Sequence, residues 1–341
     1  MQHILLIGAG TMGGAHTFSY LGLDQAKLVG IVDIQLDKAE QLAQHAGARA
    51  FATIEEALQS LERVDIVDVC VPTFLHKEFV LKAAEQGKHV ICEKPLAGNL
   101  KDAREMIEYC ESRQVQLFVG HVVRFFPEYE KAKSHLDNGA IGQVGVVRMT
   151  RAGQMPIGWN DWYADFAQSG GVVMDLSIHD IDFLRWCFGD VERVYAKSLH
   201  GRTKHANGRM DYALVTLRFK NGVIAHVEGS WAHEGFTTKY EIAGSGGIID
   251  FDSNKDTSFA LTRRQAAVTA TGVYVPESPL VQTPYARELQ HFIGCLEDGS
   301  TPKVTAEDGY KAVEIVLAAI QSMETGQPVT LGEHALPALS N

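Results

Sequence analysis

Short runs of apolar, mostly β-branched residues alternate with longer amphipathic stretches along the first third of the chain. This alternation is typical of parallel strands joined by helices that cover the sheet. The expected strands are His3 to Ile7, Leu28 to Asp33, Ile66 to Val71, His89 to Cys92 and Leu117 to Val119, and the expected helices are Thr11 to Leu21, Leu36 to Ala46, Ile54 to Leu61, Lys77 to Gln86 and Leu100 to Ser112. The pattern predicts a doubly wound α/β domain with a parallel sheet over residues 1–120.

After about residue 121 the pattern changes to longer strands with alternating apolar and polar positions. The expected strands are Gly145 to Arg151, Val191 to Leu199, Tyr212 to Phe219, Val223 to Trp231, Tyr240 to Ala243 and Gly247 to Phe251, with helices at Pro127 to Asn138, Val172 to Cys187 and Ala306 to Glu324. Asn221-Gly222 is a strong signal for a two-residue hairpin turn. We therefore predict a second, α+β domain over residues 121–341, built on an open, mainly antiparallel β-sheet with flanking helices.

Composition and charge narrow the classes of partner. A chain of 341 residues exceeds one comfortable hydrophobic core, which agrees with two domains. The net charge of −11 is spread along the chain, which argues against nucleic acid or an anionic membrane as a partner. No apolar run approaches the roughly 20 residues of a membrane helix, and Ile4 to Ile7 is too short for a signal-peptide core. We expect a cytoplasmic protein whose five widely spaced cysteines are reduced structural thiols.

The segment Gly8-Ala9-Gly10-Thr11-Met12-Gly13 follows a predicted buried strand and opens a helix. In this context Gly8 permits a tight turn, Gly10 lets the backbone approach a pyrophosphate, and Gly13 lets the helix pack on the strand. Asp33 ends the next strand, 20 residues after Gly13. Its carboxylate would accept hydrogen bonds from ribose hydroxyls and repel a 2′-phosphate, so the sequence predicts NAD as the cofactor, with NADP disfavoured.

Two further segments carry residue types suited to proton transfer. Lys94, in Glu93-Lys94-Pro95, follows a predicted parallel strand at the edge where ligands of open α/β sheets bind, although a solvated surface lysine is the simpler interpretation. Asp175 and His179 are four residues apart on one helix face, where a histidine can act as general base, although an exposed ion pair explains the spacing equally well. Asp175, His179 and Asp182 could also coordinate a metal ion, but no other ligands stand at a recognisable spacing, so we expect none.

Taken together, these segments identify the chain as resembling the Gfo/Idh/MocA family, named for glucose-fructose oxidoreductase and inositol dehydrogenase. The resemblance spans almost the whole length. The matching segments are Gly8 to Gly13, Val71-Pro72-Thr73 with His76, Glu93-Lys94-Pro95, Gly170-Gly171 through Asp175, His179 and Asp182, Tyr285 to Phe292, and Gly326 to Val329. The resemblance implies a Rossmann domain joined to a mainly antiparallel sheet domain, with the active site between them.

The resemblance also implies roles for individual residues. Lys94 would polarise a substrate hydroxyl, Asp175 would hold a hydroxyl or steer the base, and His179 would take the proton while hydride leaves for the nicotinamide. Pro72, Thr73, His76 and Glu93 would line the nicotinamide end of the cofactor, and Val71 and Lys94 are also expected to contact the cofactor. A homodimer or homotetramer through the second sheet is expected as well, since an uncovered apolar face favours a partner.

Four positions leave alternatives open. Ser169 and Ser177 stand where many relatives have glycine, and the Ser177 hydroxyl could alter substrate contacts. Arg124 is expected either to reach substrate or cofactor or to form a structural ion pair. Trp162, in an aromatic cluster with Trp159 and Tyr163, is expected either to cap a sugar ring or simply to pack beneath its loop.

The function predicted from these features is NAD-dependent oxidation of a secondary hydroxyl of a cyclic polyol or sugar, such as an inositol or an aldose. Two alternatives remain at this point. One is the NAD-assisted glycoside hydrolysis known within this family, and the other is a non-catalytic NAD-binding regulator, since a fold can persist after its chemistry is lost.

Overall fold

The structure is a computed structural model that describes residues 1–200, 210–255, 258–263 and 282–332. Its first sheet has six strands in the order β3-β2-β1-β4-β5-β6, and all their pairings are parallel. The strands are β1 (Gln2–Ile7), β2 (Ala26–Val32), β3 (Arg49–Phe51), β4 (Ile66–Val69), β5 (His89–Glu93) and β6 (Leu117–Gly120). The helices between them are α1 (Thr11–Tyr20), α2 (Leu36–Ala46), α3 (Ile54–Ser60), α4 (His76–Glu85) and α5 (Leu100–Ser112). The predicted doubly wound α/β domain is confirmed.

Local signals in the sequence explain where several of these elements begin and end. The side chain of Thr53 accepts a hydrogen bond from Glu56 N and caps α3, and Asn99 accepts one from Asp102 N and caps α5. Gly47 ends α2 in the left-handed conformation that glycine adopts without strain. The short edge strand β3 was not predicted, because its three residues have no apolar run.

The second sheet has eight strands in the order β13-β12-β11-β7-β10-β9-β8-β14. Their bounds are β7 (Val144–Gln154), β8 (Val191–His200), β9 (Met210–Phe219), β10 (Ile224–Ser230), β11 (Ala232–Gly244), β12 (Gly247–Asp252), β13 (Phe259–Arg263) and β14 (Val329–Thr330). All pairings are antiparallel except that of β7 with β10. A hairpin joins β9 to β10 at Asn221-Gly222 as predicted, but its loop has three residues, 220–222, because Phe219 N bonds to Val223 O; Gly222 has φ 97°.

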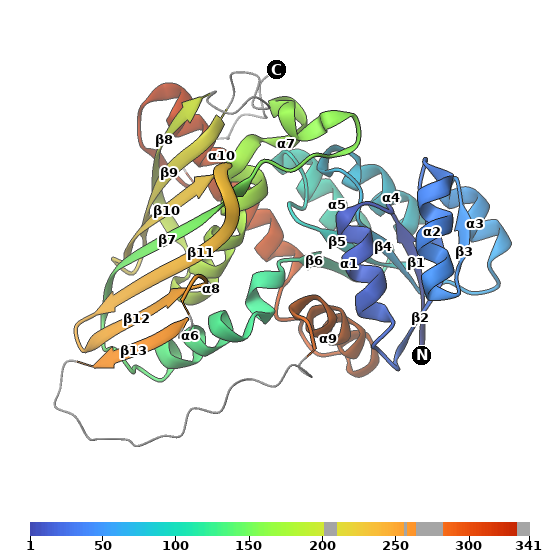
Figure 1. Ribbon diagram of the computed structural model, residues 1–341, viewed down its shortest axis with the longest axis horizontal. Helices are drawn as coiled ribbons and strands as arrows, with labels where there is room; N and C mark the ends of the chain where they lie inside the picture. The colour runs from blue at the N-terminus through green and yellow to red at the C-terminus, as the bar shows by residue number, and fades with distance from the viewer. Residues whose placement is uncertain (201–209, 256–257, 264–281, 333–341) are drawn as a thin grey trace.

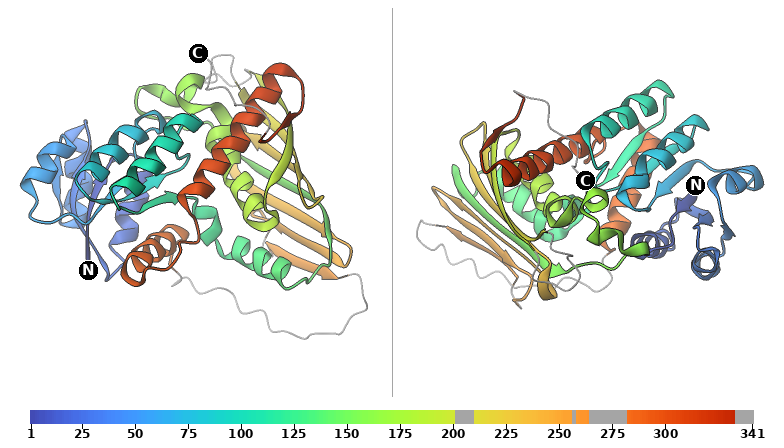
Figure 2. Two further views of the ribbon diagram at one scale, coloured as in Figure 1. Left: turned by 180° about the vertical axis from the view of Figure 1, so that it is seen from behind. Right: turned by 90° about the horizontal axis from the view of Figure 1, so that it is seen from above.

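Helices cover only one face of this sheet among the described residues (Figure 2). They are α6 (Pro127–Asp137), α7 (Phe166–Ser169), α8 (Ile178–Phe188) and α10 (Ala306–Thr325), with a π-helical turn at Val173–Ser177 directly before α8. The inner face of the sheet buries Val147, Val215 and Val227 against these helices. The outer face is mostly polar, with charged residues such as Arg148, Glu241 and Lys239 among exposed Tyr195 and Leu214. It is therefore less apolar than the sequence pattern indicated.

One helix returns from the second half of the chain to the first domain. Helix α9 (Pro284–Asp298) lies against α1, and its apolar residues Leu289, Phe292 and Ile293 belong to the core of the parallel sheet (Figure 1). The sequence analysis assigned this segment to the second domain and did not predict the helix. The two domains are thus connected both by the chain after β6 and by α9.

No helix among the described residues combines the length and apolar character that crossing a membrane requires.

Candidate active site

The glycine-rich turn connects β1 to α1 at the carboxyl edge of the parallel sheet. Gly8 has φ 101°, and a Cβ atom there would lie 2.5 Å from the carbonyl oxygen of Cys70. A Cβ atom on Gly13 would lie 1.9 Å from the carbonyl oxygen of Gly8. Both glycines are therefore required by the protein's own packing, as the sequence predicts.

Gly10 differs from its two neighbours in the motif. A Cβ atom at Gly10 would meet nothing within 4 Å, so the space beside this backbone is open. Gly10 is also the N-cap of α1 and offers no side chain to cap the first-turn N–H groups, which stay available to an anion. Open space next to free amide donors fits a dinucleotide pyrophosphate. Ala9, Thr11 and Met12 complete the turn.

Asp33 follows β2 and faces the glycine turn. Its Oδ2 atom accepts a hydrogen bond from Ala9 N at 2.7 Å, and its Oδ1 atom accepts one from Gln35 N at 2.8 Å. These bonds fix the carboxylate beside the expected ribose position. The next residue, Ile34, is exposed and brings no positive charge that would attract a 2′-phosphate.

Lys94 and Asp175 meet across the two domains. The Lys94 ammonium donates hydrogen bonds to Asp175 Oδ1 at 3.0 Å and to the backbone carbonyl of Asp175 at 2.8 Å. Lys94 comes directly after β5, and Asp175 lies in the π-helical turn before α8. Both side chains are only slightly exposed, so this ion pair lies in a partly desolvated setting.

His179 lies at the start of α8, four residues after Asp175. Burial, followed by the positive charges of Lys94 and Arg151, holds the pKa of His179 well below its usual value. The imidazole is therefore neutral at pH 7 and able to accept a proton. Its Nδ1 atom is buried and has no hydrogen-bond partner among the described residues. The structure thus brings together a cation, a carboxylate and a neutral imidazole, the three groups selected from the sequence.

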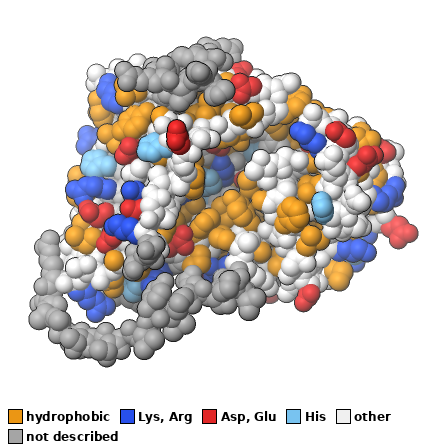
Figure 3. All heavy atoms as spheres, viewed as in Figure 1, with side chains coloured by type: hydrophobic (Ala, Val, Ile, Leu, Met, Phe, Trp, Pro, Cys, Tyr) orange, Lys and Arg blue, Asp and Glu red, His pale blue; other side chains and the backbone are white. Residues whose placement is uncertain are grey.

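An aromatic segment from the second domain covers the same region. The segment Trp159–Ala164 forms short 3₁₀ turns, in which the ring centroids of Trp162 and Tyr163 lie 4.0 Å apart. The Trp162 ring also packs edge-on against Phe74 of the first domain, with 6.2 Å between the ring centroids. Trp162 is only 8% exposed, which supports packing rather than stacking on a sugar. Burial and the charge of Asp175 raise the pKa of Tyr163, which places this phenol near the site. Figure 3 shows hydrophobic side chains gathered in the middle of the face between the two domains.

Several residues that the resemblance places at the nicotinamide end have buried side chains. The ring of His76 is buried, and its two nitrogens lie 2.9 Å from the carbonyl oxygens of Pro95 and Val71, so it connects the two loops. Thr73 and Glu93 are buried as well. Pro72 and Val71 remain partly exposed at the edge of the sheet. His76 and Glu93 therefore lie behind the loops that the resemblance assigns to the nicotinamide end.

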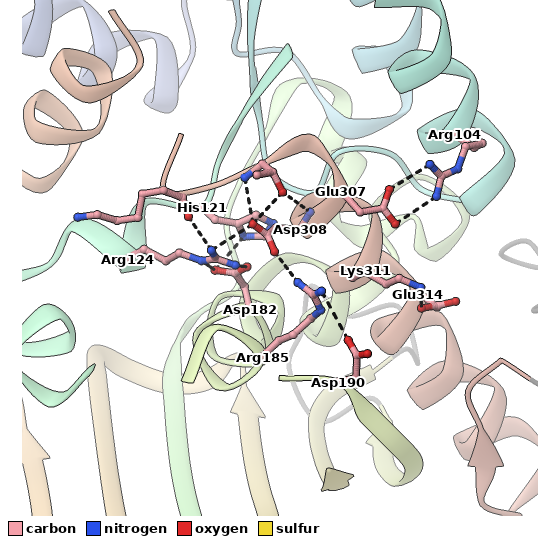
Figure 4. A network of polar contacts seen from close by, with 12 residues as sticks. Arg104, His121, Arg124, Asp182, Arg185, Asp190, Glu307, Asp308, Lys311 and Glu314 are labelled. Atoms are coloured by element: carbon pink, nitrogen blue, oxygen red, sulfur yellow. Dashed lines mark hydrogen bonds and ion pairs between the residues drawn. The ribbon is translucent and has the colours of Figure 1, made fainter. Parts of the chain in front are cut away.

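The Arg124 side chain is buried and bonded to groups within the protein. It is 2% exposed, and its guanidinium donates to both carboxylate oxygens of Asp182, at 2.8 and 2.6 Å, and to the carbonyl of Lys303 at 2.7 Å. Figure 4 shows this pair beside Asp308, which also contacts Arg124 and Arg185. These contacts support the structural ion pair over the substrate-binding role for Arg124. Because its carboxylate is bound to Arg124, Asp182 does not join Asp175 and His179 in a metal site.

The two serines that replace family glycines also have internal roles. Ser177 Oγ is fully buried and has no hydrogen-bond partner among the residues that the structure describes. A Cβ atom built on Gly229 of β10 would lie 2.2 Å from this oxygen. Ser169 Oγ donates to the carbonyl of Tyr163 at 2.9 Å and accepts from Gly171 N at 3.1 Å. Ser177 therefore faces the sheet, and Ser169 holds the loop before the π-helical turn that carries Asp175.

The sequence analysis missed one group of residues behind the site. His16, Asp68 and Glu93 form a fully enclosed polar cluster between α1, β4 and β5. The available signal was a histidine three residues after Gly13, on the helix face that packs on the sheet, together with an aspartate inside an otherwise apolar strand.

Comparison with known proteins agrees with the two-domain arrangement. Residues 2–121 match the oxidoreductase family NAD-binding Rossmann fold, and residues 133–331 match the oxidoreductase family C-terminal alpha/beta domain. The chain is 34% identical to myo-inositol 2-dehydrogenase of Thermotoga maritima, covering 97% of this chain and 99% of that protein. It is 33% identical to scyllo-inositol 2-dehydrogenase (NAD(+)) of Bacillus subtilis, covering 96% and 95%.

A solved structure, a probable dehydrogenase from Thermotoga maritima, superposes with a TM-score of 0.81 at 31% identity, covering 97% of this chain and 99% of the other. Family matches over both domains, together with full-length relatives above 30% identity, establish the relationship predicted from the motifs. The chain is an oxidoreductase of the Gfo/Idh/MocA family.

Proposed function

We propose that this protein is an NAD-dependent dehydrogenase that oxidises a secondary hydroxyl of a cyclic polyol or sugar, with an inositol as the leading candidate. The observation that carries the proposal is the Lys94–Asp175 pair, which spans the two domains beside the neutral imidazole of His179. The relatives named as inositol 2-dehydrogenases, which align over nearly the whole chain, support the substrate class.

The roles of the three residues follow from their charges. Bound NAD would supply the hydride acceptor. The Lys94 ammonium would donate a hydrogen bond to the reacting hydroxyl and stabilise the negative charge that develops on its oxygen. His179, kept neutral by burial and by Lys94, would accept the hydroxyl proton. Asp175 holds the Lys94 ammonium in place before substrate binds and is available to accept a hydrogen bond from a neighbouring substrate hydroxyl.

The preference for NAD over NADP is part of the proposal. The support is the fixed carboxylate of Asp33 beside the glycine turn and the absence of a basic residue from the three positions that follow it, Ile34, Gln35 and Leu36. A carboxylate at this point would bond to the ribose hydroxyls and would repel a 2′-phosphate.

A homo-oligomer through the outer face of the second sheet is also proposed. The support is that no described helix covers this face, which exposes Tyr195 and Leu214 among its charged residues. Light scattering of the purified protein would test this. A monomeric mass at micromolar concentration would contradict it.

Two alanine variants test the catalytic assignment. Lys94→Ala and His179→Ala are each expected to lower kcat by about 10² to 10⁴-fold, because each removes a group that acts on the reacting hydroxyl. The affinity for NADH, measured by fluorescence titration, should remain near wild type. Lys101→Ala, an exposed lysine of α5, is the matched control and should keep full activity. Wild-type turnover by either site variant would remove that residue from its proposed role.

A further inference from the structure

His16 occupies an unusual place for a histidine. It is fully buried in α1, one turn after Gly13, so the helix that begins at the dinucleotide turn also carries this imidazole. Its Nδ1 atom lies 2.8 Å from Asp68 Oδ2, and its Nε2 atom lies 3.1 Å from Glu93 Oε1. The ring therefore bridges two carboxylates that come from adjacent parallel strands.

Both ring nitrogens must donate if both hydrogen bonds are to form, and only the protonated imidazole has two N–H donors. Burial alone would lower the pKa of His16, but its interactions with Asp68 first and then with Cys70 outweigh burial, and the pKa is raised well above its usual value. The pKa of Glu93 is lowered by His16 and by Lys94 in spite of burial. The geometry therefore fits a protonated imidazole that donates to both carboxylates.

The other groups around the ring leave this charge pattern intact. From α1, the Tyr20 hydroxyl donates to Asp68 Oδ2 at 2.7 Å, and directly after β4 the Cys70 thiol lies 3.4 Å from His16 Nδ1. From α9, Tyr285 packs its ring 6.1 Å from that of His16. Glu288 on the same helix is fully buried, and burial and Glu93 raise its pKa well above the usual value, so it adds no charge.

The bridge leads directly to the proposed active site. While Glu93 Oε1 faces His16, Glu93 Oε2 accepts a hydrogen bond from the backbone N–H of Lys94 at 3.0 Å. The Lys94 ammonium then reaches Asp175 in the other domain. Asp68, His16, Glu93 and Lys94 therefore form a continuous chain of hydrogen bonds from the interior of the parallel sheet to the site.

We propose that His16 is a positioning residue for Lys94: by bridging Asp68 and Glu93 it fixes the Glu93 carboxylate, which holds the backbone of Lys94 and so sets where its ammonium reaches. This inference rests on the proposed catalytic role of Lys94. It also connects the helix that carries the dinucleotide turn to the residue that acts on substrate, since His16 and the turn belong to the same element.

A metal ion is the competing explanation for the same cluster, because ligand atoms of His16, Asp68 and Cys70 lie within 4.8 Å of one another. A metal would need the Nδ1 lone pair and a thiolate. In the structure, Nδ1 of His16 lies 2.8 Å from Asp68 and Nε2 lies 3.1 Å from Glu93, so neither ring nitrogen presents a free lone pair to a cation. The short Nδ1 to Asp68 distance instead suits a shared proton.

Two variants separate positioning from simple structural support. His16→Gln removes the imidazole that faces Glu93. Tyr20→Phe removes a hydrogen bond to Asp68 Oδ2, the oxygen that also faces His16, and leaves the bonds of Glu93 in place. We expect His16→Gln to lower kcat by about 10²-fold, since small displacements of catalytic groups cost this much. The KM for substrate and the Kd for NADH should change by less than about threefold. Tyr20→Phe should keep the wild-type kcat even if its melting temperature falls as far as that of His16→Gln.

The inference would be overturned if His16→Gln kept the wild-type kcat, or if Tyr20→Phe lost as much kcat as His16→Gln. Lys94→Ala, assayed alongside, separates this result from the proposed function. Full activity of Lys94→Ala would remove the catalytic role of Lys94, whereas an inactive Lys94→Ala with a fully active His16→Gln would remove only the role of His16.

One readout needs no turnover. In protein carrying ¹⁵N-labelled histidine, both nitrogens of His16 should show shifts of a protonated ring across neutral pH, and the His16→Gln spectrum assigns those signals. A neutral ring, or a metal ion that copurifies with the protein in equal amount and is lost in His16→Gln, would contradict the bridge.

Discussion

The buried Arg124–Asp182 pair offers a quantitative test of how the site is supported. Replacing Arg124 by Met keeps much of the side-chain volume but leaves the carboxylate of Asp182, itself fully buried, without its bidentate partner. Removing one partner of a buried ion pair typically costs about 3 to 5 kcal/mol, because the remaining charge stays desolvated. We expect Arg124→Met to lower the free energy of unfolding by an amount in this range.

The assay is urea denaturation followed by near-ultraviolet circular dichroism, together with steady-state kinetics on the folded variant. Arg148→Met is the matched control, since Arg148 is 60% exposed and pairs with Glu241 on the outer sheet face. Exposed pairs contribute about 0 to 1 kcal/mol, so this variant should be nearly as stable as wild type. The double variant Arg124→Met/Asp182→Leu should recover part of the loss, because an apolar pair tolerates burial.

The kinetics decide between support and ligand contact. If Arg124 is structural, the KM of Arg124→Met should stay within about twofold of wild type wherever the variant is folded. A large rise in KM with unchanged stability would refute the reasoning and restore Arg124 to substrate binding.

The remaining predictions concern the cofactor turn and the proton acceptor. Gly10→Ala should weaken NADH binding in a fluorescence titration without lowering the melting temperature, because its Cβ atom enters open space. Gly13→Ala should lower the melting temperature, because its Cβ atom would lie 1.9 Å from the carbonyl oxygen of Gly8. Equal melting temperatures of the two variants would contradict this prediction. Asp33→Ala should narrow the preference for NAD over NADP in kcat/KM, and unchanged selectivity would exclude Asp33 from that role. The folded-state pKa of His179 is depressed, so the unfolded chain binds its proton first as pH falls below about 6.5, and its contribution to stability is lost in that direction. For the same reason, the acid limb of the kcat/KM profile, which reports groups of the free enzyme, should lie below pH 6.5, and a limb at or above that value would be inconsistent with a neutral base of lowered pKa.

Much of the fold follows from short-range patterns in the sequence. The parallel domain was predicted nearly element by element, since buried strands and capped helices leave clear local signals, such as those at Thr53 and Asn99. Edge strands β13 and β14 were not predicted, because strands with little burial lack the alternating pattern. Helix α9 has a proline at its first turn and a capping threonine, yet which core it packs on depends on the whole fold.

The candidate site, like the fold, could be predicted from the sequence only in part. The glycine turn and Asp33 are recognisable from sequence, because a dinucleotide requires residues at fixed local spacing. Lys94 and Asp175 lie 81 residues apart, and only the resemblance, not their spacing, indicated that they act together. Arg124 shows the limit most clearly: the sequence allows a ligand contact or an ion pair, and the choice depends on Asp182, which is 58 residues away along the chain.

The most direct test of the central claim is the formation of reduced nicotinamide when the purified protein is mixed with NAD and a panel of free inositols and aldoses. The account predicts that absorbance of NADH rises with at least one free cyclic polyol or sugar, in equal amount to the ketone or lactone formed, and that Lys94→Ala abolishes the rise. Hydrolysis of a glycoside with no net change in NADH, and no oxidation of any free polyol or sugar, would contradict it.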